Sequence, residues 1–101
     1  MIAQTAAAET SAFNPTPTVY DLPFVSPCSD GTKDLWAVET AGNWAADCDT
    51  GASHGAALIG FMQQTENPSI LGMVVQRMAQ RGTWSGVECG FLQTIAEATL
   101  R

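Results

Sequence analysis

The sequence predicts a mainly α fold, a small array or bundle of three to four helices with an extended, proline-rich N-terminal arm. Apolar residues recur at three- and four-residue steps from residue 43 onward, which is the period of one helical face. Four of the five prolines lie between residues 15 and 27, where each fixes φ and disfavours helix. We therefore divide the chain into the arm, residues 1–33, and a compact helical domain, residues 34–101.

The arm combines prolines with spaced apolar side chains. Residues 1–12 are rich in Ala and Thr and would form at most a weak helix, and the prolines that follow favour extended or polyproline II backbone. The apolar side chains are Phe13, Val19, Tyr20, Leu22, Phe24 and Val25. Such a segment gains free energy by burying these groups, either along its own domain or on a partner. We therefore take Phe13, Tyr20 and Phe24 as candidate partner contacts.

Residues 34–39, Asp-Leu-Trp-Ala-Val-Glu, fit either a short strand or the first turn of a helix. Their polar and apolar residues alternate only ambiguously, and the sequence shows no obvious second strand to pair with them. We therefore favour the helix.

A helix is predicted over residues 43–64. Its apolar face is formed by Trp44, Cys48, Ala52, Gly55, Ile59 and Met62. We expect Trp44 to lie in the core as part of this face. Interior glycines cost a helix about 1 kcal/mol each relative to Ala. The glycines therefore indicate either close approach by a packed neighbour or a break near Gly51, which would divide the helix into 43–50 and 52–64.

The last two predicted helices have the clearest ends. Asn67 is a candidate N-cap with Pro68 at the first helical position, and Gly82 lies just past the end. The final helix opens on a capping box made by Ser85 and Glu88. The pair has the outline of a helix-turn-helix reader, but its last helix offers few side chains that reach bases or phosphates. An ordinary αα-hairpin is therefore favoured.

The charge pattern argues against several classes of partner. The net charge of −6 includes only four Lys and Arg residues, too few for a basic stripe that binds nucleic acid or an anionic membrane. Residues 34–49 contain no base but four carboxylates: Asp34, Glu39, Asp47 and Asp49. This stretch is a candidate contact for a protein with a basic surface. The alternative is that a mild acidic excess only keeps the protein in solution.

The start of the sequence and the cysteines favour a cytoplasmic protein. Residues 1–12 contain no Lys or Arg and make a poor signal peptide, and the longest apolar run, residues 55–62, is too short to span a bilayer. Cys28, Cys48 and Cys89 are an odd set without metal-binding spacing, which predicts neither a disulfide framework nor a zinc site. We expect Cys48 and Cys89 to act as small apolar fillers inside helices.

His54 is the only histidine, and on a helix it shares a face with Asp47. The pair resembles an acid–base couple or two ligands of a metal site, but two ligands are too few and no nucleophile is fixed nearby. We therefore predict no enzymatic activity, no cofactor and no metal. A small enzyme or metal-dependent protein that uses Asp47, His54 and Asp49 is kept as an alternative.

Trp36 and Trp84 are the best candidates for anchoring a partner, because Trp is enriched at the centres of interfaces and both lie at junctions between elements. The function predicted is a non-catalytic protein-binding module, a small acidic regulator or inhibitor of a larger complex. An inhibitor encoded by a phage or mobile element, of the anti-CRISPR kind, is one concrete form. There are two alternatives: the protein is an accessory subunit of an assembly, or it forms a homo-oligomer by exchange of the arm.

Overall fold

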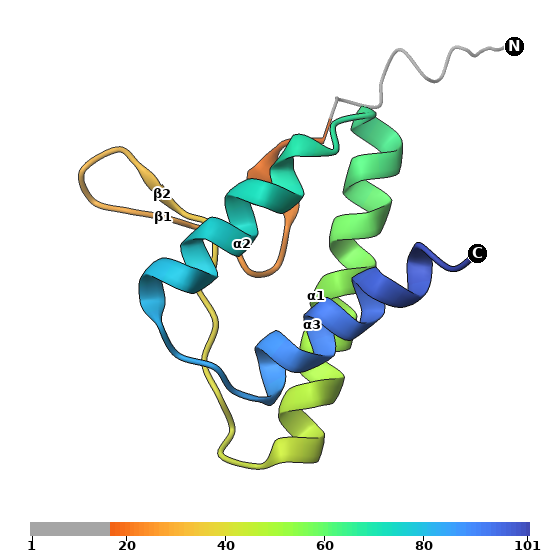
Figure 1. Ribbon diagram of the computed structural model, residues 1–101. Helices are drawn as coiled ribbons and strands as arrows, with labels where there is room; N and C mark the ends of the chain where they lie inside the picture. Colours follow the sequence, from red (N-terminus) through yellow and green to blue (C-terminus); the bar gives the residue numbers. More distant parts are fainter. Residues whose placement is uncertain (1–16) are drawn as a thin grey trace, which may run out of the picture.

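The computed structural model describes residues 17–101, so Phe13 and the first part of the predicted arm lie outside the described residues. Over this range the protein is mainly α, as the sequence predicted, with three α-helices, one 3-10 turn and two short strands (Figure 1). The elements are η2 (Val19–Asp21), β1 (Ser26–Pro27), β2 (Lys33–Asp34), α1 (Trp44–Thr65), α2 (Ser69–Arg81) and α3 (Gly86–Ala98).

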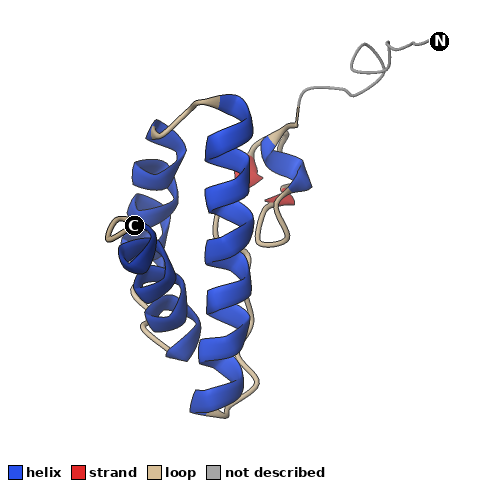
Figure 2. Ribbon diagram, turned by 90° about the vertical axis from the view of Figure 1, so that its right-hand side faces the viewer, coloured by secondary structure: helices blue, strands red, loops and turns tan. Residues whose placement is uncertain are grey.

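The three helices form one layer of the fold, and the segment from η2 to the start of α1 forms the other. α3 crosses in front of α1 in Figure 1, whereas the segment that runs from η2 to the start of α1 begins behind α2, and its turn between β1 and β2 projects to the left beyond α2. Figure 2 shows the same division from the side, with α2 and α3 on one side of α1 and η2 and the strands on the other. The core between the layers contains Leu22, Phe24, Trp36, Val38, Leu58, Phe61, Ile70, Val74, Met78, Val87 and Phe91.

α1 is one unbroken helix of 22 residues, so the predicted helix is confirmed and the alternative break near Gly51 is not found. Asn43 is its N-cap, because the Asn43 side chain accepts a hydrogen bond from the Ala46 backbone N–H at 3.0 Å. The helix ends at Glu66, whose φ of 54° is left-handed. The prediction that the glycines mark close approach by a neighbour is confirmed for Gly51 and Gly55, and that neighbour is α3, whereas a Cβ at Gly60 would meet nothing within 4 Å.

The contact between α1 and α3 is built from glycines on both helices. They form two pairs with four-residue spacing, Gly51 and Gly55 on α1 and Gly86 and Gly90 on α3. A Cβ at Gly51 would overlap the Val87 carbonyl oxygen, and one at Gly90 would overlap the Cys48 carbonyl oxygen. Only residues without side chains allow two helix backbones to approach this closely.

The ends of α2 and α3 follow local capping rules. α2 begins at Ser69, one residue later than predicted, with Pro68 at the N-cap position; the Asn67 side chain still accepts hydrogen bonds from the Ser69 N–H at 3.2 Å and the Ser69 hydroxyl at 2.6 Å. Gly82 ends the helix as predicted, with a φ of 71° and its N–H donating to the Met78 carbonyl. The capping box of Ser85 and Glu88 at the start of α3 is also confirmed.

The helix favoured over residues 34–39 is wrong. β2 pairs antiparallel with β1 instead, matching Asp34 with Ser26, and the following residues are extended or turn. Side chains along this extended segment alternate, so that Trp36 and Val38 both point into the core. Between them, the Ala37 N–H donates to the Phe24 carbonyl at 2.7 Å. The partner strand β1 could not be recognised in the sequence, because it is two residues long and one of them is a proline.

No helix among residues 17–101 combines the length and the apolar character that a membrane crossing requires.

Candidate functional site

Trp36 and Phe24, both expected to contact a partner, are fully buried. Their ring centroids lie 5.2 Å apart, and Phe91 of α3 lies 4.8 Å from Trp36 and 5.8 Å from Phe24. The segment before α1 therefore buries these two aromatic groups in its own domain, which was one of the two options for the arm. As a correction, neither side chain is available at the surface for a partner.

Trp36 also makes a buried polar contact with α3. Its indole Nε1 donates to Glu88 Oε2 at 2.7 Å, while Glu88 Oε1 accepts from the Ser85 N–H and the Ser85 hydroxyl, both at 2.6 Å. Burial by itself raises the pKa of Glu88, but the hydrogen bonds from Ser85 and Trp36 outweigh it and hold that pKa below its ordinary value. One carboxylate thus caps α3 and ties the segment before α1 to it.

Two of the four carboxylates that were predicted to contact a partner form hydrogen bonds inside the molecule instead. Asp34 accepts from Arg77 Nε at 2.9 Å and from the Trp36 N–H at 3.0 Å, and the Arg77 bond holds the pKa of Asp34 below its ordinary value. Asp47 is only 5% exposed, and its Oδ1 accepts from the Ala41 N–H at 2.7 Å. Glu39 and Asp49 are both exposed, so these two carboxylates are available to a partner.

Arg81 holds the end of α2 on the extended segment. Its Nη1 donates to the Trp36 carbonyl at 2.6 Å and to the Val38 carbonyl at 3.3 Å. An open groove of about 580 Å³ lies alongside and brings together two of the predicted residues, Asp34 and Glu39. Its lining is Pro23, Val25, Ser26, Asp34, Ala37, Val38, Glu39 and Arg81. Arg81 was not singled out from the sequence, because a base in the last turn of a helix is already explained by its favourable interaction with the helix dipole.

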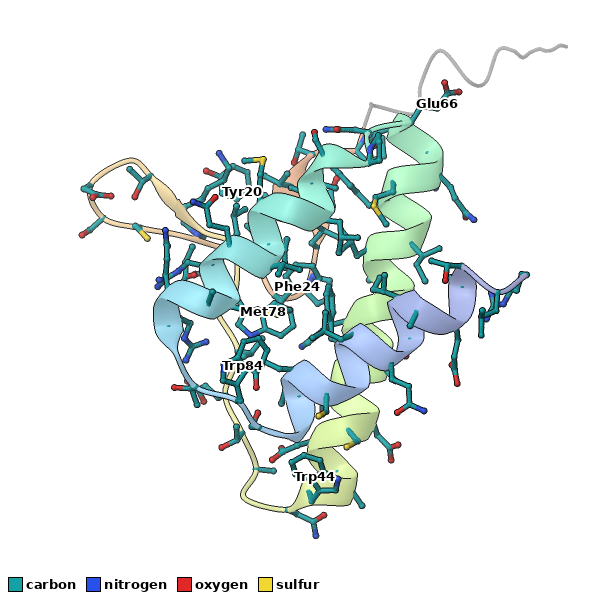
Figure 3. The ribbon with its side chains drawn as sticks, in the orientation of Figure 1. Tyr20, Phe24, Trp44, Glu66, Met78 and Trp84 are labelled. Atoms are coloured by element: carbon teal, nitrogen blue, oxygen red, sulfur yellow. The ribbon has the colours of Figure 1, made fainter. Side chains whose placement is uncertain are left out.

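Trp84 and Trp44 are the large aromatic side chains with the greatest exposure in the described chain, at 58% and 62%. They flank the start of α3: Trp84 precedes Gly86 by two residues, and a Cβ at Gly86 would lie 2.8 Å from the Trp44 carbonyl oxygen. Figure 3 shows both in the lower half of the view and Tyr20, which is also exposed, in the upper half. We call the surface around Trp44 and Trp84 the tryptophan end; the exposed carboxylates Glu39 and Asp49 lie five residues before and after Trp44 in the sequence.

The expectation that Trp44 lies in the core is wrong. Trp44 is the first residue of α1, and α3 approaches it at Gly86, where a Cβ would lie 2.8 Å from the Trp44 carbonyl oxygen, so α3 contacts the Trp44 backbone while the indole stays 62% exposed. The pattern of α1 did not indicate that Trp44 would be exposed, since this helix separates apolar from polar residues only weakly.

His54 joins the aromatic core instead of pairing with Asp47. Its ring lies 5.4 Å from Phe24 and 6.0 Å from Trp36, and no hydrogen-bond partner of its buried Nδ1 is found among the described residues. Burial lowers the pKa of His54. Residues 17–101 contain no group of three or more His, Cys, Asp or Glu side chains arranged to hold a metal ion. An enzyme that uses Asp47 and His54 stays a prediction.

No family model, no curated protein and no solved structure matches this chain. Function is therefore inferred from the residues and their geometry alone.

Proposed function

We propose that the protein is a non-catalytic binding module, a small acidic regulator or inhibitor of a larger protein complex, and that the tryptophan end contacts the partner. The observation that carries the proposal is the exposure of Trp44 and Trp84 on either side of the start of α3. Large indoles left at the surface of a small domain are typical of binding hot spots.

The charges at this end favour a partner with a basic surface. Asp34 and Asp47 are held by internal hydrogen bonds, whereas Glu39 and Asp49 are exposed and lie five residues before and after Trp44. With a net charge of −6 the whole molecule also attracts a basic partner at long range, which raises association rates and makes them depend on salt.

The tryptophan end is supported by rigid neighbours. Glu88 joins Trp36 to Ser85, which follows Trp84 directly, and Arg81 joins the end of α2 to the same extended segment. The loop that carries Trp84 is thus fixed on both sides. A surface that is ordered before binding loses less conformational entropy when a partner docks, so more of its contact energy appears as affinity.

The N-terminal arm is proposed to contribute to the same binding module. Tyr20 is exposed, and together with Phe13, which precedes the described residues, it gives the arm a second contact with the partner. We place the protein in the cytoplasm. An inhibitor of the anti-CRISPR kind, encoded by a phage or mobile element, is one concrete form; an accessory subunit is the alternative. A homo-oligomer formed by arm exchange is the third form, and light scattering on the full chain and on the chain without residues 1–16 separates it from the other two.

The test uses the full chain, immobilised and exposed to an extract of its source cells. The double variant Trp44→Ala/Trp84→Ala is compared with Met73→Ala/Leu100→Ala, which removes two other exposed apolar side chains. A partner retained by the wild type and by the control should bind the tryptophan variant at least tenfold more weakly, about 1.4 kcal/mol, and should dissociate as salt rises. Equal binding by both variants, with circular dichroism spectra unchanged, would overturn the proposal.

A further inference from the structure

Two cysteines from different helices lie at the contact between α1 and α3. Cys48 is partly buried on α1, and Cys89 is exposed on α3. Both were expected to act as small apolar fillers, but the exposure of Cys89 shows that it fills no space in the core.

The backbone geometry sets an upper limit on the distance between the two cysteines. Gly90, the residue after Cys89, lies so close to α1 that a Cβ on it would be 2.9 Å from Cys48 Cα. The Cα–Cβ bond of about 1.5 Å and the step of about 3.8 Å between consecutive Cα atoms then limit the distance from Cys48 Cα to Cys89 Cα to about 8 Å. That limit applies only if all three steps lie on one line, and any bend shortens it towards the range of about 4.4–6.8 Å found in disulfides.

Both side chains also lie on the same rim of the contact. On α3, Gly90 faces α1 and Phe91 faces the core, so Cys89 is rotated about 100° from Gly90 in the direction away from the core. On α1, Gly51 faces α3, the core residue Phe61 lies about 80° to one side of Gly51 around the helix, and Cys48 lies about 60° to the other side. Burial raises the pKa of the Cys48 thiol and the neighbouring Cys89 raises it further, which agrees with two sulfur atoms near each other.

We propose that Cys48 and Cys89 are a redox-active dithiol, a modification site that a small disulfide such as oxidised glutathione converts into a cross-link between α1 and α3. This site goes beyond the proposed binding function and does not depend on it.

The reaction proceeds by two thiol–disulfide exchanges. Cys89, the more exposed thiol, loses its proton and attacks one sulfur of oxidised glutathione; a Cys89–glutathione disulfide forms, and the other glutathione leaves as a thiolate. Cys48 then loses its proton, attacks the Cys89 sulfur and releases the second glutathione. The two cysteines are oxidised by two electrons, oxidised glutathione is reduced to two thiols, and the protons from the cysteines end on those thiols.

The raised pKa of Cys48 affects the second step. Less of the Cys48 thiol is ionised near neutral pH, so closure of the cross-link should speed up as pH rises towards the alkaline range. The cross-link would fix the crossing that the glycine pairs build, four residues after Trp44 and five after Trp84.

The test equilibrates the full chain with mixtures of reduced and oxidised glutathione, blocks free thiols with an alkylating reagent and maps the peptides by mass spectrometry. Trypsin cleaves after Lys and Arg, which separates the cysteines into three peptides: residues 1–33, 34–77 and 82–101. The exposed Cys28 in the first peptide reports how strongly each mixture oxidises an isolated thiol.

We expect the second and third peptides to become joined in monomeric protein, with loss of the mass of two hydrogen atoms, while Cys28 carries glutathione. The same cross-link should form in Cys28→Ser, should raise Tm by on the order of 10 °C and should be reversed by dithiothreitol. Cys89→Ser should form no cross-link within the monomer. If Cys48 and Cys89 instead remain separately alkylated, or carry only glutathione, in mixtures that modify Cys28 fully, the proposal is overturned.

Discussion

Gly90→Ala is expected to destabilise the protein, because α3 contacts the α1 backbone at this residue. A Cβ on Gly90 would overlap the Cys48 carbonyl oxygen and would lie 2.8 Å from its carbonyl carbon and 2.9 Å from its Cα. These atoms belong to the interior of a helix, so they have no freedom to rotate away as the end of a flexible side chain would. Accommodating one methyl group therefore requires the two helices to separate.

Two opposing effects set the magnitude. Replacing Gly with Ala inside a helix stabilises it by about 1 kcal/mol, because Ala loses less backbone entropy on folding. Overpacking costs about 1–3 kcal/mol in ordinary cores and more where the neighbour is rigid. The overlap here is with backbone, and separation of the helices also loosens the packing of the adjacent Phe91. We expect a net loss of about 2 kcal/mol in the free energy of unfolding, which lowers Tm by roughly 8–16 °C.

The assay is urea unfolding followed by far-UV circular dichroism, with Gly72→Ala as the matched control. Gly72 lies inside α2, and a Cβ there would meet nothing within 4 Å. The same substitution at Gly72 should therefore raise the free energy of unfolding by about 1 kcal/mol. A Gly90→Ala variant as stable as the wild type, alongside a stabilised Gly72→Ala, would show that α1 and α3 do not approach as closely as the structure indicates.

Trp36→Phe keeps a ring in the core but removes the indole donor, so the buried Glu88 carboxylate loses one hydrogen bond; urea unfolding should show a loss of about 1–3 kcal/mol, and an unchanged midpoint would contradict the role given to this contact. The folded pKa values of Asp34 and Glu88 lie below their ordinary values, so the unfolded chain binds more protons in acid and stability should fall as pH drops below about 4.5. Asp34→Asn should reduce that acid loss, and an identical pH profile would count against it. Burial also lowers the pKa of His54, so stability should already begin to fall below about pH 6.5. His54→Phe should remove the loss of stability that begins at about pH 6.5 and keep the loss below about pH 4.5. If the loss that begins at about pH 6.5 persists in this variant, it belongs to another group.

The helix ends were predictable because capping is local. Gly82 and the capping box of Ser85 and Glu88 act through hydrogen bonds between residues at most four apart, and the structure confirms each. The glycine spacing in α1 was also informative. It indicated close approach by a neighbour, although α3 could be identified as that neighbour only from the structure.

The tryptophans show where sequence reasoning failed. Trp44 was expected in the core and is exposed, whereas Trp36 was taken as a binding candidate and is fully buried. The segment before α1 follows no helical period, so its pattern left open whether its aromatic groups pack on their own domain or on a partner, and it did not indicate that Trp36 and Phe24 would complete the core. The bond from Trp36 to Glu88 joins residues 52 positions apart, and no sequence window detects such a pairing.

The sequence by itself therefore determined the helical class, the end of α2, the start of α3 and the acidic excess, because periodicity and capping depend on neighbours within a turn or two. Tertiary structure alone decided which groups remain at the surface. Packing held Asp34 and Asp47 in internal hydrogen bonds, left Glu39 and Asp49 exposed, and brought Cys48 near Cys89 across a glycine contact. Each of these outcomes depends on which helix faces cover one another, and that is settled only when the whole chain packs around one core.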